Sequence, residues 1–211
     1  ANIQPGTTST FNYNDTATQA VVFDATASTY SKLKLSNTSV SGATLSTAIS
    51  TTNVTGDILV ASGLFSSSVA ITGTPGRAFG VSNSATFEMT GTATFPTGSG
   101  ISFGATSTER YKQTTDSLTI TARKYGNLEL KPADGSNTWS FTTAITTLVS
   151  GSMTFGDGVQ TGNTFNHASA TALINITKNL WILSGATYTY TSAQVTNVGG
   201  SWYNLGTFNR G

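Results

Sequence analysis

The side chains that could carry acid–base chemistry are few, and they form no visible cluster. Glycoside hydrolysis needs two carboxyl groups at a fixed separation, which folding can assemble from distant positions. Because the acids are scattered, we expect them to be solvated or turn-forming, and an enzyme acting on polysaccharide is the least favoured function. The nine carboxylates are Asp15, Asp24, Asp57, Glu88, Glu109, Asp116, Glu129, Asp134 and Asp157.

The chain has a single histidine, His167, and no cysteine. Metal sites with two imidazoles or with thiolates are therefore excluded, as are cysteine nucleophiles. A Ser-His-Asp triad stays open, because its members need not be adjacent in sequence. We expect His167 to be a surface or corner residue, and we predict no catalytic residue, no metal site and no cofactor.

Two Asp-Gly pairs, Asp134-Gly135 and Asp157-Gly158, could lend oxygen atoms to a calcium ion. A dedicated calcium site needs several such groups in register, and the nonapeptide calcium repeat is missing. Asp-Gly is also a common turn sequence, because Asp accepts local backbone hydrogen bonds and Gly tolerates positive φ. The sequence therefore predicts turns at both positions.

Aromatic residues are concentrated near the C-terminus, at Trp181, Tyr188, Tyr190, Trp202 and Tyr203. Exposed aromatic faces serve as sugar-binding platforms, and protein interfaces are enriched in the same residues. The internal repeat described below aligns Trp181 with a buried-type Phe, which predicts a core position. For Trp202 and Tyr203, an interface role and a core role remain equally open.

Threonine pairs such as Thr187-x-Thr189 and Thr119-x-Thr121 raise the possibility of ice binding, which regular threonine arrays support. Threonine on the outward face of any strand gives the same pattern. A regular Thr-x-Thr at every rung is absent from the sequence, so ordinary outward-facing threonines are the favoured explanation.

The composition excludes several classes of partner and favours secretion. Only 9% of residues are charged and the net charge is +1, so no basic cluster is available for nucleic acid. No run of 18 apolar residues occurs, which argues against a membrane span. The absence of cysteine, the scarcity of charge and a start without Met favour an extracellular, cell-surface or secreted product that is already processed.

Strand signatures dominate the chain, and helix signatures are almost absent. Thr and Ser fill about a third of the positions, and 22 Gly punctuate the sequence. Pairs such as Leu33-x-Leu35, Leu128-x-Leu130 and Trp139-x-Phe141 place two apolar side chains on one face of a short strand. The sequence therefore predicts an all-β protein.

The chain also repeats itself. Tyr30–Leu35 recurs as Tyr125–Leu130, and Val54–Val60 recurs as Val149–Phe155, each at an offset of 95. Two weaker anchors are Thr47–Thr51 with Thr143–Thr147, and Phe87–Gly91 with Trp181–Gly185. We predict a tandem duplication, with a first β-rich unit over residues 1–105 and a second over 106–211, both within one continuous solenoid.

Two architectures suit a β-rich unit of this length. An immunoglobulin-like sandwich places strands every 8 to 12 residues, whereas a β-solenoid stacks short strands along parallel faces. The strands are very short, no tyrosine corner can be placed, and Thr, Ser and Asn suit stacked polar ladders and turns. The sequence therefore favours a parallel β-helix, with two tandem immunoglobulin-like sandwiches as the alternative.

At these anchors the chain resembles secreted bacterial repeat proteins of the parallel β-helix, adhesin-like type. The shared pattern is Tyr-x-x-Leu-x-Leu, then Val-x-Gly-x-Leu-x-Ile, then a Gly-x-Trp-x-Asn-x-Gly-x-Phe ending, found here at Gly200–Phe208. The resemblance implies a parallel β-helix fold and secretion, and it carries over no catalytic residue.

The first and last strands suggest how such a protein functions. The C-terminal sequence Leu205–Arg210 resembles Thr8–Tyr13, so the chain stops where another copy of its own start would begin. We expect uncapped ends that pair head to tail with copies of the same chain in a surface filament, fibre or matrix.

The rival explanation of the uncapped ends is that the sequence is an excerpt of a longer repetitive chain. The alternative function is a carbohydrate-binding adhesin module that contacts surface polysaccharide. The predicted subunit interface comprises Thr8, Thr10, Phe11, Tyr13, Trp202, Tyr203, Leu205 and Phe208.

Overall fold

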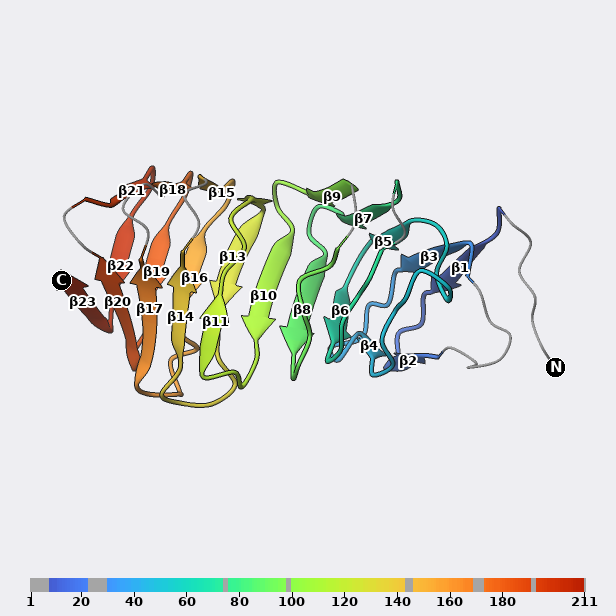
Figure 1. Cartoon of the computed structure of the whole chain (residues 1–211), viewed down its shortest axis with the longest axis horizontal. Coiled ribbons are helices and arrows are strands. Elements are labelled where there is room, and N and C mark those ends of the chain that lie inside the picture. Colours follow the sequence, from blue (N-terminus) through green and yellow to red (C-terminus); the bar gives the residue numbers. More distant parts are fainter. Residues whose placement is uncertain are drawn as a thin grey trace. The chain divides into compact units, whose positions relative to one another are not determined.

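The computed structural model describes residues 8–22, 30–73, 76–97, 100–142, 146–168, 173–190 and 193–210. Over these residues the chain forms short β-strands joined by turns, without a helix (Figure 1). Every pairing between the described strands is parallel, as between β1 and β3 or β17 and β20. Parallel pairing is incompatible with the antiparallel sheets of an immunoglobulin-like sandwich. The sandwich alternative is therefore wrong.

The chain forms two compact units, Ala1–Ser107 and Thr108–Gly211. The first unit contains two parallel sheets. One has the order β1 (Thr10–Tyr13), β3 (Lys32–Leu35), β5 (Ile58–Val60), β7 (Ala78–Val81) and β9 (Gly100–Phe103). The other has the order β2 (Gln19–Val21), β4 (Ala43–Leu45), β6 (Leu64–Ser67) and β8 (Thr86–Thr90).

The second unit has three strands in most turns, so its sheets form three faces. The first face contains β10 (Thr108–Lys112), β13 (Asn127–Leu130), β16 (Met153–Phe155), β19 (Leu180–Ile182) and β22 (Trp202–Asn204). The second contains β11 (Ser117–Thr119), β14 (Thr138–Phe141), β17 (Asn163–His167), β20 (Ala186–Tyr190) and β23 (Thr207–Arg210). The third contains β12 (Lys124–Tyr125), β15 (Thr147–Val149), β18 (Leu173–Ile176) and β21 (Val195–Val198).

Alternation of apolar and polar residues explains why these short strands stack. In β3, Leu33 and Leu35 are each 1% exposed, while Lys32 and Lys34, which alternate with them, point away from the core. Parallel register places Leu33 beside Ile58 of β5, so each turn covers the apolar pair of the turn before. Repeated over about eight turns, this pattern makes an all-β parallel solenoid and confirms the predicted fold class.

A pair of buried tyrosines recurs in both units. The hydroxyls of Tyr13 and Tyr30 are 3.1 Å apart, and Tyr30 also donates to the carbonyl of Val22. The hydroxyls of Tyr111 and Tyr125 are 3.0 Å apart, and Tyr125 donates to the carbonyl of Thr121 at 2.6 Å. Tyr30 and Tyr125 are the residues that the sequence repeat aligns, so the repeated motif marks the same polar core contact in each unit.

One alignment of the sequence repeat, Phe87 with Trp181, does not pair equivalent positions in the structure. Phe87 in β8 is fully buried, whereas Trp181 in β19 lies half-buried between Leu180 and Ile182, which point inward. The register pairs Leu180 with Met153 and Ile182 with Phe155, so Trp181 faces outward. The predicted core position of Trp181 is therefore wrong, because the run Leu-Trp-Ile-Leu has no alternation that would indicate its inward face.

Candidate functional site

Several of the described residues that could do chemistry make contacts within the fold instead. Among the described residues, no group of three or more His, Asp or Glu side chains could hold a metal ion. Asp157 accepts hydrogen bonds from the backbone N–H groups of Val159 and Gln160, each 2.8 Å long. Asp134 accepts a bond from the amide of Asn137 at 2.9 Å. Both carboxylates make local turn contacts, which confirms the prediction of turns at these positions.

His167 was expected at the surface or in a corner, and this expectation is wrong. It is an inward-facing residue of β17 and only 2% exposed. Its Nδ1 atom lies 3.4 Å from the Tyr188 hydroxyl and 3.4 Å from the Thr196 hydroxyl. His167 follows Phe165 by two positions on the same strand, and this spacing was the available signal that the ring points inward.

One match to the Gly-x-Ser-x-Gly pattern of hydrolases occurs at residues 100–104. In those enzymes the serine sits on a sharp turn from a strand into a helix. Here Ser102 lies within β9 and is exposed on the side of the strand away from the core. The local structure therefore lacks the geometry that makes such a serine a nucleophile.

Charged residues gather at one place in the second unit. Arg110 donates from Nε to the Glu129 carboxylate at 2.6 Å, and Lys131 donates to the same oxygen at 3.0 Å. Burial acts to raise the pKa of Glu129, but these two cations outweigh it and hold the pKa below its usual value. Arg110 and Lys131 line a shallow hollow of about 340 Å³ together with Lys112 and Asp157.

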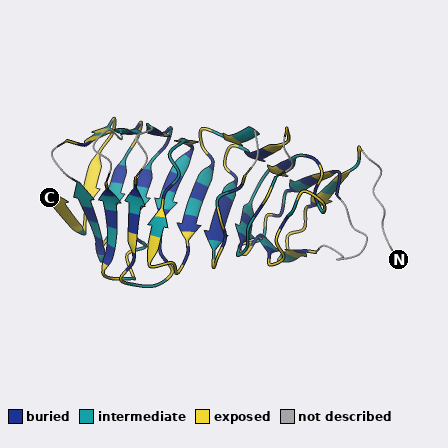
Figure 2. Cartoon of the chain, in the orientation of Figure 1, coloured by how far each residue is buried: buried dark blue, intermediate teal, exposed yellow. Residues whose placement is uncertain are grey.

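The last coil, formed by β21, β22 and β23, presents the most apolar exposed surface of the second unit. Trp202 and Tyr203 are each 41% exposed, Leu205 is 69% and Phe208 is 37%. Figure 2 shows β22 and β23 as mostly exposed strands, unlike the strands beside them. All four C-terminal residues of the predicted interface therefore lie together in this coil.

The register explains why these side chains are exposed. Trp202 pairs with Leu180, and Phe208 pairs with Tyr188, so both occupy inward positions of the solenoid. One coil earlier, Leu180 and Tyr188 are buried at 0% and 1% exposure. Trp202 and Phe208 thus have core positions but no covering coil among the described residues.

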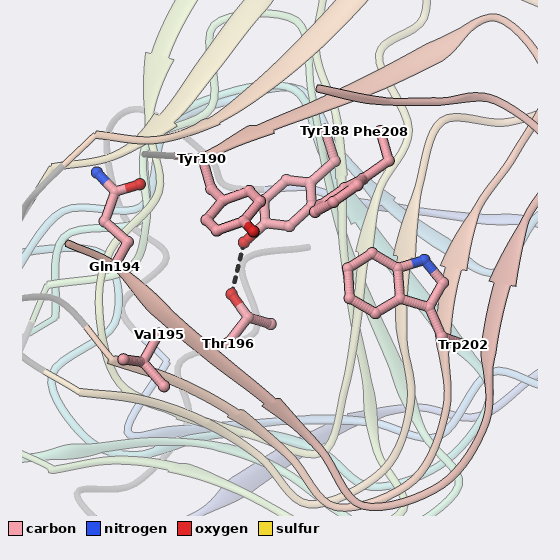
Figure 3. A pocket seen from close by; sticks show the side chains of 7 residues that line it. All are labelled: Tyr188, Tyr190, Gln194, Val195, Thr196, Trp202 and Phe208. Atoms are coloured by element: carbon pink, nitrogen blue, oxygen red, sulfur yellow. Dashed lines mark hydrogen bonds between the residues drawn. The ribbon is translucent and has the colours of Figure 1, made fainter. Parts of the chain in front are cut away.

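A pocket of about 220 Å³ opens between β20 and the strands of the last coil (Figure 3). Its lining residues are Tyr188, Tyr190, Gln194, Val195, Thr196, Trp202 and Phe208. The Phe208 ring packs against Tyr190 at 5.0 Å and edge-on against Trp202 at 4.8 Å, measured between ring centroids.

Two of the hydroxyl groups that line this pocket contact each other. The hydroxyls of Tyr188 and Thr196 lie 2.6 Å apart. Burial raises the pKa of Tyr188 to about 12, although the hydrogen bond with Thr196 acts in the opposite direction. The pocket thus offers aromatic walls and neutral hydroxyls, which suit apolar side chains or a neutral ligand better than acid–base catalysis.

The four N-terminal residues of the predicted interface belong to the first unit. Thr8 and Thr10 are exposed, Phe11 is half-buried, and Tyr13 is a core residue at 9% exposure. The Phe11 ring packs on Tyr30 with centroids 4.7 Å apart. Only the two threonines are therefore fully available for a contact with another molecule.

Comparison of the chain with protein families, with curated proteins and with solved structures gives no match. The described residues also include no helix long and apolar enough to cross a membrane.

Proposed function

We propose that this chain is a non-enzymatic structural protein that associates with further copies of itself through the last coil. The observation that carries the proposal is the exposure of Trp202 and Phe208 at positions that are buried one coil earlier. Covering an aromatic or aliphatic side chain of this size is favourable by about 1.5–3 kcal/mol. A further coil would cover both rings and Leu205 at once.

The backbone supports the same contact. Among the described strands, β22 pairs only with β19, and β23 pairs only with β20. The opposite edges of β22 and β23 therefore present N–H and C=O groups to which another strand can be added. Because β22 and β23 carry no acidic side chain and the whole chain has a net charge of +1, copies repel one another little.

The occupant that we propose is the first coil of a second copy. Thr8 and Thr10 are exposed in that coil. The sequence of β1, Thr10-Phe-Asn-Tyr13, is nearly that of β23, Thr207-Phe-Asn-Arg210, so the two ends present similar strands. Head-to-tail pairing through these strands would build a filament, fibre or matrix.

The place of this assembly is outside the cell. The resemblance to secreted adhesin-like repeat proteins, the absence of cysteine and the low charge support an extracellular or cell-surface location. A carbohydrate-binding module is the second candidate, favoured by the pocket walls of Tyr190 and Trp202 beside two hydroxyls, a chemistry that also suits a sugar ring. That function predicts a monomer that binds polysaccharide.

Sedimentation velocity over a range of concentrations tests the proposal. We expect the unaltered chain to form larger species as concentration rises, and the double variant Leu205→Lys, Phe208→Lys to remain monomeric. Val159→Lys is the matched control, because Val159 is 77% exposed but lies outside the last coil. Circular dichroism checks that the variants fold. An unaltered chain that stays monomeric at every concentration overturns the proposal, and glycan-array binding by that monomer would support the adhesin function.

A further inference from the structure

The outward side of the sheet β11-β14-β17-β20-β23 carries hydroxyl and amide side chains in two straight rows. Each strand contributes one residue to each row, with one inward-facing residue between them. The first row is Ser117, Thr138, Thr164, Thr187 and Thr207. The second is Thr119, Ser140, Asn166, Thr189 and Asn209. We call these ten residues the hydroxyl face.

The spacing of the hydroxyl face is regular in two directions. The strands pair in parallel register from β11 to β23 without a shift between successive rungs. Neighbouring parallel strands lie about 4.8 Å apart, and residues two apart on one strand are separated by about 6.6 Å. The polar groups therefore form a repeating grid.

The rows of the hydroxyl face are not visible as a regular Thr-x-Thr repeat in the sequence. A strict Thr-x-Thr on every rung is indeed absent, but Ser and Asn complete the pattern where Thr is missing, as in Thr138-x-Ser140 and Thr164-x-Asn166. The rungs are separated by loops of unequal length, so a search for one constant period in the sequence does not find the rows.

The side chains of the hydroxyl face are free to bind something outside the protein. None of the ten makes a side-chain hydrogen bond to another described group. In the first unit, by contrast, the outward Ser66 donates to Glu88 at 3.1 Å and Thr90 donates to the carbonyl of Ser67 at 3.3 Å. The ten side chains of the hydroxyl face thus differ from these two outward hydroxyls of the first unit.

Two features hold these groups in fixed positions. Threonine fills six of the ten positions, and its branched Cβ restricts χ1. Beneath them, the inward residues Trp139, Phe165 and Tyr188 are at most 1% exposed and pack closely. A rigid grid loses little conformational entropy when it binds an ordered surface.

We propose that the hydroxyl face binds the surface of ice. Its ten residues are uncharged, and the outward positions include no aromatic or large aliphatic side chain. This chemistry does not suit a nucleic acid, which needs basic groups, or an apolar protein surface. Regularly spaced hydroxyl and amide groups suit water that is itself arranged on a lattice. The inference is independent of the self-association proposed above.

Thermal hysteresis and inhibition of ice recrystallisation, measured on the full chain, test this inference. We expect the unaltered protein to be active in both assays and Thr164→Lys, Thr187→Lys to lose most of both activities, because long charged side chains interrupt the grid. Thr86→Lys is the matched control: Thr86 is also a half-buried strand threonine, but it lies on β8 in the first unit. We expect it to keep full activity.

A milder variant separates loss of ice activity from loss of folding. Thr164→Val, Thr187→Val keeps the shape of both side chains and removes only their hydroxyls, and we expect a partial loss of activity with an unchanged circular dichroism spectrum. Three results would overturn the inference: no ice activity in the unaltered chain, equal loss in Thr86→Lys, or full activity in Thr164→Lys, Thr187→Lys. Retention on microcrystalline cellulose without ice activity would overturn it too and would assign the face to a crystalline polysaccharide.

Discussion

Trp181 and Tyr203 lie face to face on the outward side of β19 and β22, with ring centroids 3.8 Å apart and planes inclined by 11°. The parallel register places them opposite each other on neighbouring strands. Each ring therefore covers one face of the other, and this contact stabilises the junction between the last coil and the coil before it.

A double-mutant cycle should measure this stack. We expect Trp181→Ala and Tyr203→Ala to be coupled by about 1 kcal/mol in the free energy of unfolding, the usual size for an aromatic pair. Trp181→Ala combined with Leu148→Ala is the control, because Leu148 lies on a different sheet. Additive effects of Trp181→Ala and Tyr203→Ala in urea unfolding would contradict the contact.

The buried tyrosines should make the protein sensitive to alkali. Burial raises the pKa of Tyr188 to about 12 and raises those of Tyr30, Tyr111 and Tyr125 as well. In the unfolded chain tyrosine titrates near pH 10. Folding stability should therefore be fully present below about pH 10 and should fall as the pH rises from there through about 12.

Denaturant unfolding between pH 7 and pH 11.5 measures this dependence. Tyr188→Phe removes one of the titrating groups, so its stability should fall less steeply with pH than that of the unaltered chain. Equal slopes in the two proteins would show that Tyr188 ionises freely in the folded state.

Glu129 should make the opposite contribution in acid. Arg110 and Lys131 hold its folded pKa below the usual value despite burial, so its stabilising effect is present above the unfolded pKa of about 4.3. This effect is lost as the pH falls through the folded pKa. We expect Glu129→Gln to be less stable than the unaltered chain at pH 7 and to lose less stability on acidification. Parallel pH profiles of the two proteins in urea unfolding would contradict this account.

Close coil packing makes one glycine irreplaceable. Gly63 has φ of 69°, and a Cβ at this position would overlap the backbone carbonyl of Asn37 in the preceding coil. We expect Gly63→Ala to cost more than about 4 kcal/mol, as large steric changes in a core do. Gly158→Ala is the control, since its φ is 81° but a Cβ would meet nothing within 4 Å.

The control isolates the effect of packing. Gly158→Ala should cost only about 1–2 kcal/mol, the strain of positive φ alone. If thermal unfolding gave the same loss for both variants, backbone strain rather than coil contact would explain the requirement for Gly63.

Local alternation predicted the fold from sequence, and its absence caused the error at Trp181. Leu33-x-Leu35 and Leu128-x-Leu130 are inward pairs as expected, because polar residues separate the two leucines. In Leu180-Trp-Ile-Leu183 every residue is apolar, so the inward face is decided by pairing with Met153 and Phe155 and is not encoded locally.

The sites depend on neighbours that the sequence does not reveal. The sequence grouped Trp202, Tyr203, Leu205 and Phe208 as a candidate interface because they are close together in the chain, but it left a core role for Trp202 and Tyr203 equally open; the structure exposes all four. The burial of Tyr13 depends on Tyr30, which is 17 residues away. The rows of the hydroxyl face depend on register across loops of different length, and only pairing of the strands aligns them.

Negative-stain imaging of the concentrated full chain tests self-association through the last coil most directly. We predict filaments from the unaltered chain and from Val159→Lys, and discrete particles from Leu205→Lys, Phe208→Lys. Discrete particles in all three samples, or filaments that persist when Leu205 and Phe208 are both lysine, would contradict the central claim.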